Sequence, residues 1–191
     1  MMDDIFAGAI RVLKQEGGRH FTTIRVAEAA GISVGSLYQY FPNKDSILFE
    51  IQRREWVTTS SHLLGILADT QISPLDRLKR MIAQFFESEL EEADLREAIA
   101  ETGLLMEDTE DFRKIDNKVL SGMIYFLKEL LPHVPPKKSQ FLAKFLLLTI
   151  RSLAEELTTQ VRSPSDIKRW TDTCTQMVMA FLRESASGRV T

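Results

Sequence analysis

The chain has 191 residues, of which 44% are hydrophobic and 27% are charged, a balance that is ordinary for a folded globular protein and argues against intrinsic disorder. Its net charge of −3 argues against a protein that coats nucleic acid through bulk positive charge, so any DNA binding has to be local. The one cysteine, Cys174, excludes an intramolecular disulfide, and the three histidines are scattered singly, so we expect no metal site and no cofactor.

The sequence predicts a cytoplasmic protein without a membrane partner. No uninterrupted apolar run approaches the roughly 20 residues that a membrane-spanning helix needs. The N-terminus, Met1-Met2-Asp3-Asp4, is acidic and lacks the basic and apolar regions of a secretory signal.

Apolar residues recur with the spacing of a helix along nearly the whole chain, and no segment alternates as a half-buried strand does. The pattern therefore predicts an all-α fold of about nine helices. In the first helix the apolar stripe runs from Ile5 to Leu13 and ends at Gly17-Gly18, where glycine can leave a helix with a positive φ.

Two shorter helices follow, each with a hydroxyl residue at its start. Thr23 is the expected N-cap of a helix over residues 24–30, which ends at the glycine that follows. Ser33 is the expected N-cap of a helix over 34–40, which ends before Pro42 because the residue before a proline avoids helical backbone angles.

The remaining helices are longer. Asn43 is the expected N-cap of the first of them, and Pro74 suits the first position of the next. Their expected ranges are 44–69, 74–92, 95–106, 111–131, 137–161 and 164–184. The change from short to long helices predicts two domains, 1–43 and 44–191.

The second and third helices have the features of a helix-turn-helix, which needs a small residue where its helices cross and glycine or its equivalent in the turn. Ala27 is the small residue at the crossing, and Gly31 opens the turn four residues later. Leu37 and Phe41 have the spacing of core residues. The spacing alone also fits an ordinary pair of packed helices, but the polar residues of the third helix favour a surface that contacts DNA phosphates and base edges.

Residues 21–48, FTTIRVAEAAGISVGSLYQYFPNKDSIL, resemble the DNA-binding signature of TetR-type transcriptional regulators. The shared pattern is a threonine cap, Ala-Gly, and Leu-Tyr-x-Tyr/His-Phe before a lysine. With the first helix the resemblance covers about the first 50 residues, whereas the remaining 140 or so carry no comparable signature. It implies an N-terminal three-helix helix-turn-helix domain that binds double-stranded operator DNA, followed by a C-terminal helical domain for dimerisation and ligand binding.

The resemblance also implies roles for individual residues of this region. Thr23 would contact a phosphate at the start of the second helix, and Tyr40 and Lys44 would clamp phosphates. Gln39 can make a bidentate contact to adenine and is the expected base reader. Gly35 either lets the third helix approach the groove closely or merely begins that helix, and the sequence leaves both readings open. The expected DNA-binding residues are Thr23, Ser33, Val34, Gly35, Ser36, Tyr38, Gln39, Tyr40 and Lys44.

Apolar residues cover more than one face of each of the last two expected helices, which is more than one core requires. The resemblance implies that these helices form a four-helix bundle with those of a second copy, so the chain itself is an expected partner. Burial within a monomer is the alternative. The expected dimer interface consists of Phe145, Leu148, Thr149, Ser152, Trp170, Met177 and Phe181.

A ligand pocket is expected among the middle helices, although aromatic and methionine residues at helical spacing also fit a plain core. Acidic residues dominate from Glu87 to Asp111, which fits either a cationic ligand or a solvated face that repels DNA phosphates. The pocket candidates are Trp56, Phe85, Phe86, Leu104, Met106, Met123, Phe126 and Leu127.

Together these features predict a ligand-responsive transcriptional regulator. By the usual behaviour of the family it is a repressor that binds palindromic operator DNA as a dimer and is released by a small-molecule effector, whose identity the sequence does not give. The alternative is a helix-turn-helix regulator without a small-molecule ligand, which a protein partner controls or which acts constitutively. An enzyme is not expected, because no nucleophile has a neighbouring base and no glycine-rich phosphate loop is present.

Overall fold

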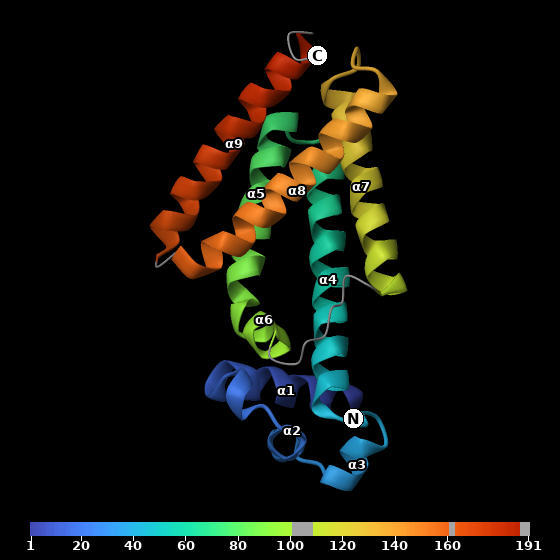
Figure 1. Cartoon of the computed structure of the whole chain (residues 1–191), viewed down its shortest axis with the longest axis vertical. Coiled ribbons are helices and arrows are strands. Elements are labelled where there is room, and N and C mark those ends of the chain that lie inside the picture. The colour runs from blue at the N-terminus through green and yellow to red at the C-terminus, as the bar shows by residue number, and fades with distance from the viewer. Residues whose placement is uncertain (101–108, 161–162, 188–191) are drawn as a thin grey trace. The chain divides into compact units, whose positions relative to one another are not determined.

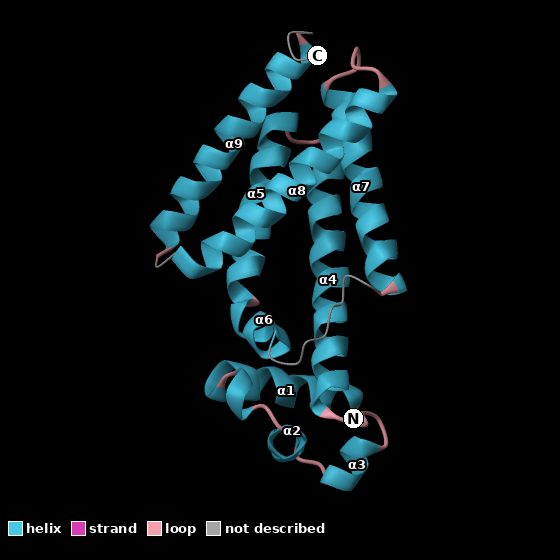
Figure 2. Ribbon diagram, in the orientation of Figure 1, coloured by secondary structure: helices cyan, strands magenta, loops and turns pink. Residues whose placement is uncertain are grey.

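The computed structural model describes residues 1–100, 109–160 and 163–187, and all the regular structure in these ranges is helical (Figure 2). The prediction of an all-α fold with about nine helices is confirmed. In chain order the elements are α1 (Met2–Glu16), the 3₁₀ turn η1 (Gly18–His20), α2 (Thr23–Ala30), α3 (Val34–Tyr38), α4 (Lys44–Ala68), α5 (Pro74–Glu91), α6 (Ala93–Ala100), α7 (Glu110–Leu130), α8 (Pro136–Gln160) and α9 (Pro164–Ala186) (Figure 1).

Two compact units make up the chain. Unit 1 consists of Met1–Val57 and Glu91–Arg113, and unit 2 consists of Thr58–Leu90 and Lys114–Thr191. The helix α4 begins in unit 1 and ends in unit 2. The predicted domain boundary, between residues 43 and 44, lies at the first residue of α4 and stays a prediction.

Unit 1 has a core of its own beneath α2 and α3. The predicted apolar stripe of α1 is buried, and it packs with the buried side chains of α2, α3 and the first turns of α4. The short helix α6 joins the same core, because Ala98 lies directly against the backbone of Gly18. A Cβ atom on Gly18 would lie 2.6 Å from the Cα of Ala98, so this contact requires glycine. The buried residues of this core are Ile5, Phe6, Ala9, Val12, Leu13, Phe21, Val26, Ala27, Leu37, Phe41, Ile47, Leu48, Ile51, Leu95, Ala98 and Ile99.

Unit 2 has a second core, to which α4, α5, α7, α8 and α9 all contribute. At the end of α4 a buried arginine, Arg77 of α5, donates to the backbone oxygen of Leu67 at 2.8 Å and forms an ion pair with Glu129 of α7. Leu64 packs onto α7 where Gly122 leaves no Cβ in its way. A guanidinium suits this position because it can satisfy the free carbonyl oxygens at a helix end and a carboxylate at once.

Cys174 lies buried in the core of unit 2, and this burial raises the pKa of its thiol to about 11. Among the described residues, no group of histidine, cysteine and acidic side chains is arranged to hold a metal ion. No helix in the described ranges combines the length and the apolar character that crossing a lipid bilayer requires.

Candidate DNA-binding surface

The first turn of α2 differs by one residue from the prediction. Thr22, with extended backbone angles, is the N-cap, and its hydroxyl accepts a hydrogen bond from the backbone N–H of Arg25 at 3.2 Å. The expectation that Thr23 caps the helix is therefore wrong. Of the two adjacent threonines, Thr22 has the extended backbone of an N-cap, and Thr23 is the first residue of the helix. The hydroxyl of Thr23 is free for another partner, and it shares a hydrogen bond of 3.1 Å with the phenol of Tyr38.

The turn between α2 and α3 is fixed at both ends. Gly31 adopts the left-handed conformation, with φ 70° and ψ 29°, and its backbone N–H donates to the carbonyl of Glu28. A side chain at this position would be strained, so the predicted need for glycine in the turn is confirmed. Ser33 is the N-cap of α3, as expected, and accepts a hydrogen bond from the backbone N–H of Ser36 at 3.0 Å.

The helix α3 ends at Tyr38, two residues before the predicted end. The backbone N–H groups of Gln39 and Tyr40 donate to the carbonyls three residues earlier, so the chain tightens into a turn. Leu37 is completely buried and Phe41 nearly so, which confirms that both belong to the core. On the outer side, Tyr38 and Tyr40 are 50% and 44% exposed, and Gln39 is exposed between them.

The predicted DNA-binding residues divide by exposure. Ser33, Gly35, Tyr38, Gln39, Tyr40 and Lys44 are exposed, whereas Thr23, Val34 and Ser36 are partly buried. Val34 packs against the core of unit 1, and Ser36 shares a hydrogen bond of 2.8 Å with Ser33. The exposed members therefore present hydroxyl, amide and ammonium groups, which can donate to phosphates or base edges.

No described residue of unit 1 requires glycine at position 35. Its φ is not in the left-handed region, and the atom nearest to a Cβ at this position would be the Oγ of Ser33, at an ordinary contact distance of 3.8 Å. Glycine is a poor helix former, so its presence in a five-residue helix weakens that helix. Whether the missing side chain lets the helix approach a partner closely or merely begins the helix stays open.

Two exposed residues of α2 escaped the sequence reasoning. Ile24 is 55% exposed although it is apolar, and Arg25 is exposed beside it. Both follow Thr23, whose hydroxyl bonds to Tyr38, so they extend the exposed surface from α3 onto the start of α2. The signal was in the periodicity, because Ile24 precedes the buried Val26 by two positions and so lies off the core face of the helix.

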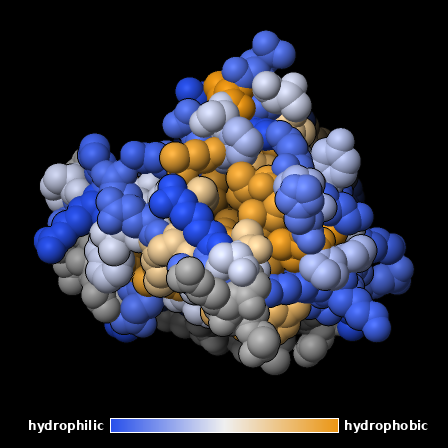
Figure 3. Space-filling model, turned by 90° about the horizontal axis from the view of Figure 1, so that it is seen from above, coloured by the Kyte–Doolittle hydropathy of each residue, from blue (hydrophilic) through white to orange (hydrophobic). Residues whose placement is uncertain are grey.

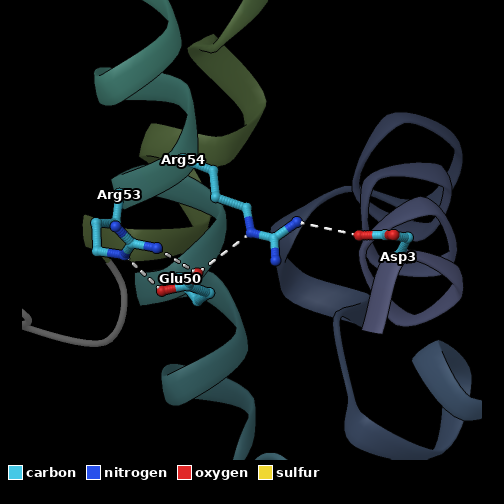
Figure 4. Close-up of polar contacts among 4 residues, drawn as sticks. All are labelled: Asp3, Glu50, Arg53 and Arg54. Carbon is cyan, nitrogen blue, oxygen red and sulfur yellow. Dashed lines mark hydrogen bonds and ion pairs between the residues drawn. The ribbon is translucent and has the colours of Figure 1, made fainter. Parts of the chain in front are cut away.

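A group of charged side chains braces α4 against α1 within unit 1 (Figure 4). Arg54 donates to Glu50 at 3.2 Å and to Asp3 at 3.4 Å, and its guanidinium lies 3.7 Å from the centre of the Phe6 ring. Arg53 makes two hydrogen bonds of 2.7 Å to the same Glu50 carboxylate. Arg53, and after it Arg54, hold the pKa of Glu50 below its ordinary value. The brace fixes the helix that follows the candidate surface.

Comparisons with known proteins agree with this geometry. Residues 5–51 match the family described as "Bacterial regulatory proteins, tetR family", and residues 73–184 match "Tetracyclin repressor-like, C-terminal domain". The chain belongs to the TetR family. This TetR-family chain is therefore a transcriptional regulator and not an enzyme.

No curated protein matches this TetR-family chain, whereas many solved structures do. A TetR/AcrR-family regulator from Thermobifida fusca YX-ER1 has a TM-score of 0.70 at 17% identity, over 92% of this chain and 94% of its own. A TetR-family regulator from Streptomyces coelicolor has a TM-score of 0.68 at 19% identity, over 98% and 82%. The regulator FadR from Bacillus subtilis, solved in complex with stearoyl-CoA, has a TM-score of 0.60 at 16% identity, over 93% and 97%. At such identities the likeness establishes the shared fold.

The expected dimer residues of this TetR-family chain include large apolar side chains that are exposed on unit 2. Leu148 is 65% exposed, and Phe145 and Met177 are exposed as well. Phe145 also contacts Phe181 across α8 and α9, with 5.0 Å between the ring centres. Ser152 is exposed, and Thr149, Trp170 and Phe181 are partly buried. Phe141 of α8, which lies against Phe145, is exposed too and extends this apolar face beyond the predicted set.

The pocket candidates fall into three groups. Phe86, Met123, Phe126 and Leu127 are fully buried in the core of unit 2, and Phe85 packs against that core. Trp56 belongs to unit 1, where its ring packs against that of Phe112 with 4.3 Å between the centres. Leu104 and Met106 lie outside the described residues. That these residues line a ligand pocket stays a prediction.

Proposed function

We propose that this TetR-family chain is a ligand-responsive repressor, which binds a palindromic operator as a dimer and leaves it when a small-molecule effector binds. One observation carries the DNA-binding part of the proposal. Around a completely buried Leu37, the helix α3 and the turn after it expose Tyr38, Gln39 and Tyr40, whose polar groups suit phosphates and base edges. Such a regulator acts on the chromosome, in agreement with the expected cytoplasmic location.

A dimer is part of this proposal because one binding head has little electrostatic attraction for DNA. Residues 1–55 contain seven basic and seven acidic residues, so this part of the chain has no net charge. Two heads held on one dimer double the oriented contacts and read two half-sites on one face of the duplex. The exposed apolar face of α8 and α9 supports self-association, because such a face loses its contact with water when a second copy covers it.

A small-molecule effector is supported by two observations. The Bacillus subtilis relative FadR was solved with stearoyl-CoA. In this chain, Figure 3 views the end of unit 2 at which α8 begins and α9 ends, and apolar atoms there lie in a hollow rimmed by hydrophilic side chains. An effector with an apolar part fits such a surface. Its binding would shift the population toward dimers whose two heads no longer match successive major grooves.

Selection of bound sequences from random duplex DNA tests the operator part. We expect a palindrome with half-sites one helical turn or a multiple apart, and an affinity that falls steeply with salt. Protein that retains its helical content but shows no salt-sensitive affinity for any duplex would overturn the proposal. A single site without a second half-site would contradict binding as a dimer but not DNA binding itself.

Thermal unfolding with chosen compounds tests the effector part. Stearoyl-CoA and a lipophilic cation, tetraphenylphosphonium, are two probes that differ in charge. A compound that binds the folded state raises the unfolding temperature, and an effector must also release the selected operator. If the cation alone stabilises the protein and releases the operator, the result would favour the acidic region from Glu87 to Asp111 as the part of the chain that selects the effector. If a broad set of neutral, anionic and cationic compounds leaves both readouts unchanged, the regulator without a small-molecule ligand is the better description.

A further inference from the structure

One exposed residue of unit 1 does not share the polar character of its surroundings. In the stretch from Thr22 to Lys44, every residue of which the structure describes, Ile24 is the only branched aliphatic side chain that is exposed, at 55%. It lies in the first turn of α2. The other exposed side chains of this helix are the charged Arg25 and Glu28, so Ile24 is an apolar group on a polar surface.

Packing inside unit 1 does not involve this side chain. The core face of α2 is formed by Val26 and Ala27, which are 0% and 1% exposed. Among the described residues, Ile24 is not part of the core of unit 1. Isoleucine is also a poorer helix former than alanine, so it brings no advantage to the helix itself. The side chain is therefore available for a contact outside the chain.

The helix α2 is held in a defined position within unit 1. At its start, the hydroxyl of Thr23 shares a hydrogen bond of 3.1 Å with the phenol of Tyr38, which joins the first turn of α2 to α3. At its end, Arg11 of α1 donates to the backbone oxygen of Ala29 at 3.3 Å. A side chain on a backbone that is fixed in this way loses little conformational entropy when it binds a partner. Ile24 is thus presented at a fixed place next to the candidate DNA-binding surface.

The major groove of DNA contains one feature that an aliphatic side chain can recognise. Base pairs present hydrogen-bond donors and acceptors on their major-groove edges, and thymine adds a C5-methyl group. Isoleucine has no side-chain donor or acceptor, so it cannot distinguish the polar edges. Contact with a methyl group removes apolar surface of both partners from water, which is favourable.

We propose that Ile24 is a specificity-determining residue, which packs against the C5-methyl group of one thymine in each half-site of the operator. This proposal rests on the proposed function. It adds a second base contact to the one expected from Gln39, and the two contacts differ in chemistry. Gln39 pairs with the hydrogen-bonding edge of adenine, whereas Ile24 recognises a methyl group, so each can be removed without the other.

Replacement of thymidine by deoxyuridine in the selected operator tests the proposal, because it removes the methyl group and leaves the hydrogen-bonding edge of the base pair unchanged. Each thymine is replaced in turn in both half-sites, and titration of the labelled duplex measures the affinity of the full-length protein. At one position the unaltered protein should lose affinity about fourfold per half-site, the loss that an unburied methyl group predicts. The Ile24→Ala protein should bind the original operator more weakly and lose nothing further at that position.

Two further variants are controls. Ile24→Val keeps a branched aliphatic side chain and should remain sensitive to the loss of the thymine methyl group. Leu75→Ala removes a large side chain that is 42% exposed on α5 of unit 2, and this protein should respond as the unaltered one does. All these changes are at exposed positions, so the unfolding temperatures should stay similar.

The outcomes separate this proposal from the proposed function. If every thymine tolerates replacement, or if the unaltered and Ile24→Ala proteins respond alike at every position, Ile24 does not read a thymine methyl group and the proposal is overturned. The selected operator, and with it the proposed function, would still stand. If selection from random DNA yields no operator, the proposed function fails and the role of Ile24 fails with it.

Discussion

Two exposed faces of this protein differ in their chemistry. On α3 and the turn after it, Tyr38, Gln39 and Tyr40 present polar groups above the buried Leu37. On α8 the exposed residues Phe145 and Leu148 are apolar. The first face has directional donors and acceptors, which suit the fixed pattern of a DNA groove, whereas the second offers area that gains from removal of water. A single substitution on the α3 face should therefore change base preference, whereas a single substitution on the α8 face should change self-association.

The largest effect is expected on the apolar face. Leu148→Glu places a charge where a second copy would bury it, so self-association and operator affinity should both fall roughly 100-fold or more. Sedimentation and titration of labelled operator measure the two losses. Tyr125→Glu is the control, because Tyr125 of α7 is a large exposed side chain outside this face. A Leu148→Glu protein that still dimerises and binds normally would contradict the assignment of the α8 surface.

The next effect concerns sequence preference. Gln39→Ala removes the amide that can pair with adenine, so discrimination at one base pair of each half-site should fall about tenfold. Lys44→Ala should weaken binding to all sequences alike and reduce the slope of log affinity against log salt by about one. Repeating the selection with each variant measures both. If both variants changed preference equally, the division between base reading and phosphate contact would be wrong.

A smaller loss is expected from a methyl group on α3. In Gly35→Ala the methyl group holds the backbone away from DNA, and the loss of one contact worth about 1 kcal/mol lowers operator affinity about fivefold. The unfolding temperature should stay the same or rise, because alanine favours the helix. Gly65→Ala is the matched control, since its Cβ would meet nothing within 4 Å and Gly65 lies on α4. Unchanged operator affinity in Gly35→Ala would mean that the glycine merely begins the helix.

The smallest effect concerns stability and pH. Glu50→Gln weakens the brace between α4 and α1, and the free energy of unfolding should fall by about 1 kcal/mol at neutral pH. The pKa of Glu50 is lower in the folded state than its ordinary value of 4.5. The charged carboxylate therefore stabilises the fold above pH 4.5, and this contribution is lost as the pH falls through the lower folded pKa. Thermal unfolding measured from pH 7 to pH 3 should show the stabilities of the unaltered protein and the Glu50→Gln variant converging as the pH falls. A difference that stays constant would contradict the charged carboxylate as the source of the stabilisation.

Local rules predicted most of unit 1 but did not predict how distant segments meet. Ser33 and Asn43 cap their helices as expected, since a cap depends on a few neighbouring residues. The prediction placed the N-cap at Thr23 in place of Thr22 because either of two adjacent threonines satisfies the local rule for a cap. Nothing in the pattern of α6 indicated that Ala98 packs against Gly18, because an apolar stripe does not specify its partner.

The candidate DNA-binding surface was predictable because, like the helix caps, it depends on residues that are neighbours in the sequence. Its residues lie close together in the sequence, and their exposure follows from helical periodicity around Leu37. The ion pair of Arg77 with Glu129 joins residues 52 positions apart, and only the folded chain brings them together. The pocket depends on several such distant contacts. The sequence therefore indicated apolar candidates but did not distinguish residues that line a pocket from residues that are buried in the core.

Burial of Cys174 makes its thiol a poor target for oxidants. Proteins that sense peroxide or disulfide stress through sulfur use accessible cysteines that ionise readily. A thiol with a pKa of about 11 is almost entirely protonated in a cell, and here it is also shielded from solvent. Since the chain has no other cysteine, it offers oxidants no accessible, readily ionised thiol.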